Sequence, residues 1–98
     1  MADKVLNLIA LIDCKEGKVE EVKSIILKEC LPPTQKEAGY IKYQPNCDLE
    51  NPNRLILIEE WASMDHWKAH MISPHMKVAF AKLEPLCDVT CVQASSLV

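Results

Sequence analysis

Four segments of the chain carry the hydrophobic pattern of β-strands. The segment 5–13 is a nearly continuous apolar run, 40–47 alternates between apolar and polar residues, and RLILIEEW at 54–61 is the strongest strand pattern of all. A further short segment, LCDVTCVQA at 86–94, is also expected to be a strand. Because only the polar turn 48–53 separates the second segment from the third, these two are expected to pair as a hairpin.

Between the first two strands, apolar residues recur every three or four positions over 18–30, which is the period of an amphipathic helix. Pro32 and Pro33 lack backbone N–H groups and force the residue before them toward extended geometry. We therefore expect this helix to end at Leu31. Gly39 then marks the entry into the second strand.

A second helical pattern lies between the third and fourth strands. Ser63 is a favourable N-cap for a helix that begins at Met64. The helix is expected to stop and restart at Ser73-Pro74, because serine can cap a helix and proline suits its first position. In the restarted part a single apolar stripe should face the core, formed by Met76, Ala79, Phe80 and Leu83.

The predicted order of elements is strand, helix, strand, strand, helix, strand. This βαββαβ order is that of a ferredoxin-like α+β fold, in which two helices cover one face of a four-stranded antiparallel sheet. We expect one domain over residues 1–98, with a structured core at 4–95. The first and third strands are apolar on both sides, so the uncovered face of the sheet is expected to pack against a second copy of the chain, as a homodimer.

Composition and charge narrow the range of partners and locations. The net charge is −3 and basic residues do not cluster, which argues against nucleic-acid binding. No apolar run approaches the roughly 20 residues of a membrane-spanning helix, and the first residues lack the pattern of a signal peptide. The five cysteines are an odd number without a CxxC pair, which favours free thiols in a reducing cytoplasm over a zinc site or a disulfide framework.

The stretch 57–80 contains both tryptophans and all three histidines of the chain. His66 and His70 are four residues apart, so on a helix they share a face, as two metal ligands would. No carboxylate or third histidine stands at a matching spacing, and the HExxH pattern that makes such a pair specific is absent. We therefore expect no metal and a solvated His66.

His70 is the main candidate for chemistry in this stretch. It lies at the edge of the apolar face formed by Met64, Trp67 and Met71. A partly desolvated imidazole favours its neutral form and is available as a base near pH 7. The residue pattern alone also fits a histidine that bonds the backbone of the sheet beneath the helix.

Four further residues each have two interpretations from the pattern alone. Asn7 interrupts the first strand and must satisfy its amide, either through neighbouring backbone and water or through a substrate. His75 begins the restarted helix, where a neutral imidazole is favoured, and it fits an exposed first turn as well as a pocket wall. Trp61 and Trp67 could stack on a planar ligand or fill the core.

Four short motifs together carry a family resemblance. They are the turn KEG at 15–17, the segment KEAG at 36–39 after the prolines, the strand end IEEW at 58–61, and the helical segment AHMISPHM at 69–76, which is the most specific of the four. With these motifs the chain resembles the antibiotic biosynthesis monooxygenase family, in particular its small quinol monooxygenase-like members. The resemblance extends over nearly the whole chain.

The resemblance implies a ferredoxin-like chain that dimerises through its sheet into an α/β barrel. Characterised members include oxygenases that act on planar, electron-rich phenols or quinols. These enzymes need neither metal nor flavin, because the deprotonated substrate itself passes an electron to O₂. The implied activity is that of a cofactor-free oxidoreductase whose partners are a quinol-like small molecule and O₂. The implied site residues are His70 as the catalytic base, Asn7 and Tyr43 to orient substrate oxygen, and Trp61, Trp67 and His75 as walls.

Other activities on the same scaffold match less well. Haem-degrading members have a Trp and a haem-ligating His where this chain has His70 and Phe80, so haem degradation is not expected. Asn7 is about three residues out of register with the Asn of those members, a shift that could turn it to the other face. An isomerase of phosphorylated signal sugars would need a cation, for which the strands offer Lys42 and Arg54. A non-enzymatic dimer that binds quinones or responds to stress is the remaining alternative.

Overall fold

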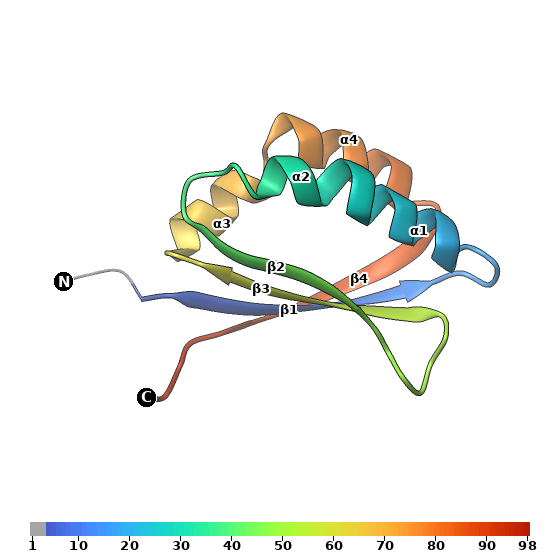
Figure 1. The fold of residues 1–98 in the computed structure, drawn as a ribbon, viewed down its shortest axis with the longest axis horizontal. Coiled ribbons are helices and arrows are strands. Elements are labelled where there is room, and N and C mark those ends of the chain that lie inside the picture. The colour runs from blue at the N-terminus through green and yellow to red at the C-terminus, as the bar shows by residue number, and fades with distance from the viewer. Residues whose placement is uncertain (1–3) are drawn as a thin grey trace.

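The computed structural model describes residues 4–98 as a four-stranded antiparallel sheet with helices on one face (Figure 1). The strands are β1 (Leu6–Cys14), β2 (Tyr40–Cys47), β3 (Arg54–Trp61) and β4 (Cys87–Ala94). They lie in the order β2-β3-β1-β4, so β2 and β3 form the expected hairpin and β1 and β3 occupy the centre. The predicted ferredoxin-like fold is confirmed.

Alternate residues of each strand point to opposite faces of the sheet, and only one face is covered by helices. In β1, Leu8 and Ile12 point toward the helices and are buried, whereas Asn7 and Ile9 point to the open face. Ile9 remains 45% exposed. The strand that we predict to be apolar on both sides is therefore buried on only one face within a single chain.

The helical layer over residues 4–98 is built from five segments. They are α1 (Val19–Ile25), the π-helical turn η1 (Ile26–Cys30), α2 (Leu31–Thr34), α3 (Met64–Met71) and α4 (Pro74–Leu83). The first three run on from one another along one side of the layer, and α3 and α4 form the other side (Figure 1). No helix among these residues is both long and apolar enough to cross a membrane.

The prediction that the first helix ends at Leu31 is wrong. The backbone N–H of Leu31 bonds the carbonyl of Ile26, five residues earlier, which widens the helix just before Pro32 and Pro33. The two prolines therefore fall in the first turn of a new helical segment, where a missing N–H costs no intrahelical hydrogen bond. The chain continues as a helix to Thr34 and turns toward β2 only after it.

Two serines set the ends of the second helical pair. The hydroxyl oxygen of Ser63 accepts the backbone N–H of His66, which confirms the predicted N-cap of α3. Ser73 and Pro74 begin α4 at the predicted place, but the Ser73 hydroxyl donates to the carbonyl of His70 at 2.7 Å and does not cap α4. This bond fastens the last turn of α3 to the first turn of α4.

The open face of the sheet carries an apolar row across its centre. Ile9 stands opposite Ile58 on β3 and opposite Val92 on β4, and directly opposed residues of antiparallel strands share a face. Leu11 and Ile56 form a second apolar pair beside this row. The face that we expect a second copy to cover is therefore apolar at its middle.

Candidate functional site

His70 occupies the last turn of α3 and points toward the sheet. It is one of the most deeply buried side chains, with 1% of its surface exposed. Its ring lies 4.7 Å from the ring of Trp61 and 5.8 Å from that of Tyr43, measured between centroids. The imidazole is thus enclosed by aromatic side chains from β2 and β3.

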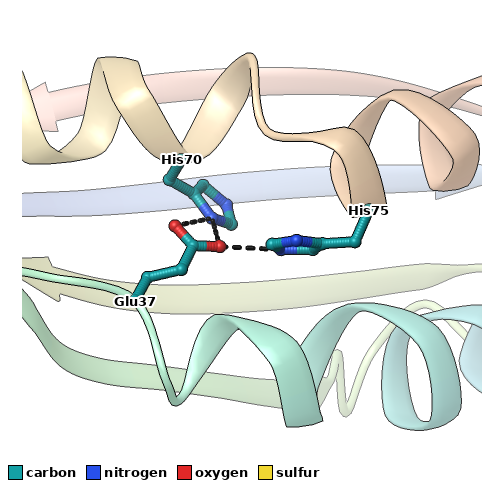
Figure 2. Close-up of side chains that lie close together, drawn as sticks. All are labelled: Glu37, His70 and His75. Atoms are coloured by element: carbon teal, nitrogen blue, oxygen red, sulfur yellow. Dashed lines mark hydrogen bonds and ion pairs between the residues drawn. The ribbon is translucent and has the colours of Figure 1, made fainter.

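The carboxylate of Glu37 lies between the rings of His70 and His75 (Figure 2). Nδ1 of His70 is 3.0 Å from Oε1 and 3.2 Å from Oε2 of Glu37, and Nε2 of His75 is 2.7 Å from the same Oε1. A carboxylate has no hydrogen to donate, so the two rings are the donors. A neutral His70 that donates from Nδ1 carries its lone pair on Nε2, the nitrogen left for a substrate.

A glycine turn brings Glu37 to this position. Gly39 has φ of +79°, and a Cβ at this residue would lie 2.2 Å from Cγ of His66. The carbonyl of Gly39 also accepts the backbone N–H of Ala62 at 2.8 Å. Only a residue without a side chain lets the turn lie this close to the start of α3.

Burial sets the protonation of His70. Desolvation lowers the pKa of His70, while the hydrogen bond and the negative charge of Glu37 partly oppose this effect. Desolvation is the larger influence because the ring is almost completely enclosed. The geometry therefore provides a neutral imidazole, held in one orientation by a carboxylate.

A second titratable group lies on the same face of the sheet. Glu59 of β3 is buried, and the indole N–H of Trp61 donates to its Oε1 at 2.9 Å. Burial raises the pKa of Glu59 to about 7, with the hydrogen bond from Trp61 lowering it and the charge of Glu37 raising it further. A carboxyl group poised near pH 7 at a cavity is a candidate acid or base.

Burial also determines the states of Tyr43 and Cys30. It raises the pKa of the Tyr43 hydroxyl well above its ordinary range, and the neighbouring Cys30 and Glu59 raise it further. Burial raises the pKa of the Cys30 thiol to about 11. Tyr43 therefore keeps its proton and can act as a hydrogen-bond donor, and Cys30 stays a thiol.

A cavity of about 50 Å³ lies between the helices and the sheet. Among the residues that line it are Tyr43, Glu59, Trp67, His70, Met71 and Cys91. An apolar cavity of about 150 Å³ holds a benzene molecule, so a quinol enters this one only if side chains at its edge move. Met71 and Trp67 are only partly buried, which leaves them room to do so.

The structure brings most of the expected site residues together. His70, Tyr43 and Trp67 line the cavity, Trp61 stacks behind His70, and His75 lies on the far side of the Glu37 carboxylate. His66 is half-buried, and its Nδ1 lies 2.7 Å from the hydroxyl of Ser63. The prediction that solvent surrounds His66 therefore holds only in part.

Asn7 is not part of this group. It is paired with Glu60 on β3 and with Ala94 on β4, so it points to the open face, opposite to the side of the sheet that carries His70. The physical reason is the two-residue period of a strand, which sends the flanking Leu6 and Leu8 to the covered face instead. The expected role of Asn7 beside His70 is therefore not supported within one chain.

Two residues that matter here were not anticipated, Glu37 and Glu59. Glu37 bonds a histidine 33 positions away, and no local pattern announces such a contact. The position of Glu59 could have been predicted from the sequence. It alternates in step with Leu55, Leu57 and Trp61, so its carboxylate lies on the same covered face of the sheet.

Comparisons with known proteins agree with the fold and identify the family. The family model described as antibiotic biosynthesis monooxygenase matches residues 6–82. The chain is 34% identical over 84 residues to the Escherichia coli K12 protein named "Probable quinol monooxygenase YgiN", with 74% of this chain and 79% of that protein covered.

Two solved structures superpose on nearly the whole chain. PA3566 from Pseudomonas aeruginosa has a TM-score of 0.90 at 23% identity, and the match covers 100% of this chain and 99% of that one. A conserved protein from Methanosarcina mazei Go1 has a TM-score of 0.88 at 27% identity, covering 95% and 93%. These structures show that the fold is shared, and the family model spans most of the sequence. The chain therefore belongs to the antibiotic biosynthesis monooxygenase family.

Proposed function

We propose that this protein is a monooxygenase that uses O₂ to oxidise a quinol or a similar planar phenol, with neither metal nor flavin in the reaction. The observation that carries the proposal is the buried His70, whose Nδ1 is held by Glu37 at 3.0 Å while its ring faces an aromatic cavity. Family membership and the likeness to the E. coli protein support it.

A quinol can supply all the electrons that such a reaction needs. Oxidation of its two hydroxyl groups to a quinone releases two electrons, and hydroxylation of one ring C–H releases two more. These four electrons reduce one O₂, with one oxygen atom entering the ring and the other leaving as water. The protein then has to deprotonate the phenol, orient it and keep water away.

Four groups at or beside the cavity have roles in this scheme. Nε2 of His70 takes the phenolic proton, and Glu37 stabilises the imidazolium that forms. The hydroxyl of Tyr43 donates to the resulting oxyanion. The indole Nε1 of Trp67 is buried without a hydrogen-bond partner among residues 4–98, so a substrate oxygen could satisfy it.

We also propose that the active form is a homodimer closed through the open face of the sheet. Ile9 and Val92 lie in one apolar row there and are 45% and 53% exposed in a single chain. Burying such a row stabilises an assembly by roughly 25 cal/mol for each Å² removed from water. All five cysteines are free thiols, which supports a reducing cytoplasmic location.

The two alternative functions, a sugar-phosphate isomerase and a non-enzymatic quinone-binding protein, can be compared at the same cavity. The described residues that line it include no lysine or arginine, so nothing there would hold the phosphate of a signal sugar, and the isomerase gains no support. A non-enzymatic quinone-binding protein would bind the same planar molecules in the same place. Turnover separates that protein from an enzyme.

The test is O₂ consumption by metal-stripped protein over a panel of substituted hydroquinones. Wild type should consume O₂ above the autoxidation background, and His70→Ala should lower the rate at least tenfold, about 1.4 kcal/mol of transition-state stabilisation. His66→Gln, on the same helix, is the matched control and should keep the wild-type rate. Saturable quinol binding without O₂ uptake would reject the enzyme in favour of a binding protein.

A further inference from the structure

Glu37, His70 and His75 present three potential metal ligands to a single point. They come from three separate segments, the turn before β2, the end of α3 and the start of α4 (Figure 2). Their donor atoms all lie within 4.8 Å of one another. We propose that these three side chains form a binding site for one Zn²⁺ ion.

The donor set suits this ion. Two imidazole nitrogens and one carboxylate oxygen are ligands that Zn²⁺ takes in protein sites that keep a fourth position open to water. The carboxylate supplies a negative charge, and both imidazoles can act as neutral ligands. Histidine and carboxylate together also favour a first-row transition metal over Mg²⁺ or Ca²⁺, which prefer oxygen ligands alone.

Only a small adjustment separates the present geometry from coordination. Oε1 of Glu37 is 3.0 Å from Nδ1 of His70 and 2.7 Å from Nε2 of His75. Zinc bonds of about 2.1 Å at tetrahedral angles would separate these donors to about 3.4 Å. The side chains of Glu37 and His75 are 17% and 24% exposed, so they can move outward while the enclosed His70 stays fixed.

The ion would replace the two hydrogen atoms that the rings now share with the carboxylate. Each imidazole would keep one proton by carrying it on its other nitrogen, so His70 would bind through Nδ1 and place its N–H on Nε2. The hydroxyl of Ser73 lies 3.4 Å from Nε2 of His75, but it already donates its hydrogen to the carbonyl of His70, so it does not compete with the ion for that nitrogen.

Zinc binding would have a consequence for catalysis, which rests on the proposed function. A proton fixed on Nε2 removes the lone pair that takes the phenolic proton. Zn²⁺ would therefore inhibit quinol oxidation, and a chelator would restore it. Binding itself requires no substrate and no turnover, so it is tested independently of the oxygenase.

Calorimetric titration of the chelator-treated protein with Zn²⁺ tests the site, and Co²⁺ absorption reports the coordination. The exposed thiols Cys47 and Cys91 are replaced by serine in every sample, because free thiolates bind zinc. Wild type in this background should bind one Zn²⁺ per chain. Glu37→Gln and His75→Ala should each weaken binding at least tenfold, whereas His66→Gln should leave it unchanged.

A measurement on the unaltered site keeps the proposal testable if a variant unfolds. Nitrogen-15 NMR of the imidazole rings should show the signals of His70 Nδ1 and His75 Nε2 shifting on addition of Zn²⁺, with the His66 signals unmoved. The absence of stoichiometric binding, or binding that survives both Glu37→Gln and His75→Ala, would overturn the site and leave the three residues as a hydrogen-bonded group only. Binding without inhibition of O₂ uptake would keep the site and reject its link to His70 as the base.

Discussion

Replacement of Glu59 by glutamine should make the protein more stable at high pH. The ordinary pKa of the carboxyl is 4.5, and burial raises it to about 7 in the folded chain. Glutamine keeps the oxygen that accepts the Trp61 N–H but carries no charge. The substitution therefore removes the cost of burying a carboxylate and leaves the hydrogen bond in place.

The pKa difference sets the size and the sign of the effect. Between pH 4.5 and 7 the folded state holds a proton that the unfolded state has lost, so the free energy of unfolding falls as pH rises through this window. Above pH 7 the full cost is present, roughly 3 kcal/mol at 1.36 kcal/mol for each pKa unit. Below pH 4.5 both states are protonated and the cost disappears.

Urea denaturation at fixed protein concentration, from pH 4 to pH 8, measures this effect. The quantity of interest is the stability of Glu59→Gln minus that of wild type, because contributions of other groups such as His70 cancel in the difference. It should be near zero at pH 4 and approach roughly 3 kcal/mol at pH 8. Glu50→Gln, in the exposed turn between β2 and β3, should show no such trend. A difference that does not change with pH would refute the reasoning.

Two further substitutions test how the site is held and how the open face is covered. Gly17 and Gly39 both have positive φ, but a Cβ at Gly17 meets nothing within 4 Å, whereas one at Gly39 meets His66. In urea denaturation, Gly17→Ala should therefore lower the free energy of unfolding by about 1 kcal/mol and Gly39→Ala by about 3 kcal/mol. Equal losses would show that the turn has room to adjust. Ile9→Glu should convert the dimer into a monomer in size-exclusion chromatography with light scattering, whereas Val78→Glu, exposed on the helical side, should not. A wild type that is monomeric at all concentrations would contradict the proposed interface.

The strands could be predicted because their pattern is local. A period of two, interrupted by turn residues, is enough to place β1 to β4 within a residue or two of their observed bounds. The first helix was harder, because the effect of Pro32 and Pro33 depends on the π-helical turn before them. That turn is a property of backbone hydrogen bonding, which residue periodicity does not report.

The candidate site was only partly readable from the sequence. The burial of His70 follows from its place beside an apolar helix face, but its bond to Glu37 depends on how the turn at Gly39 folds onto α3. Asn7 and Glu59 show the value of strand parity, since each lies on the face that its neighbours dictate. Interactions between distant segments, such as the pair of His75 and Glu37, needed the fold.

We propose that the protein inserts one atom of O₂ into a quinol with His70 as the base. The most direct measurement is mass spectrometry of the product formed under ¹⁸O₂, corrected for exchange of carbonyl oxygen with water. Wild type should give a hydroxylated quinone that contains one ¹⁸O atom, and His70→Ala of verified fold should form it at least tenfold more slowly. Oxidation to the unlabelled quinone, or formation of the labelled product by His70→Ala at the wild-type rate, would contradict the account.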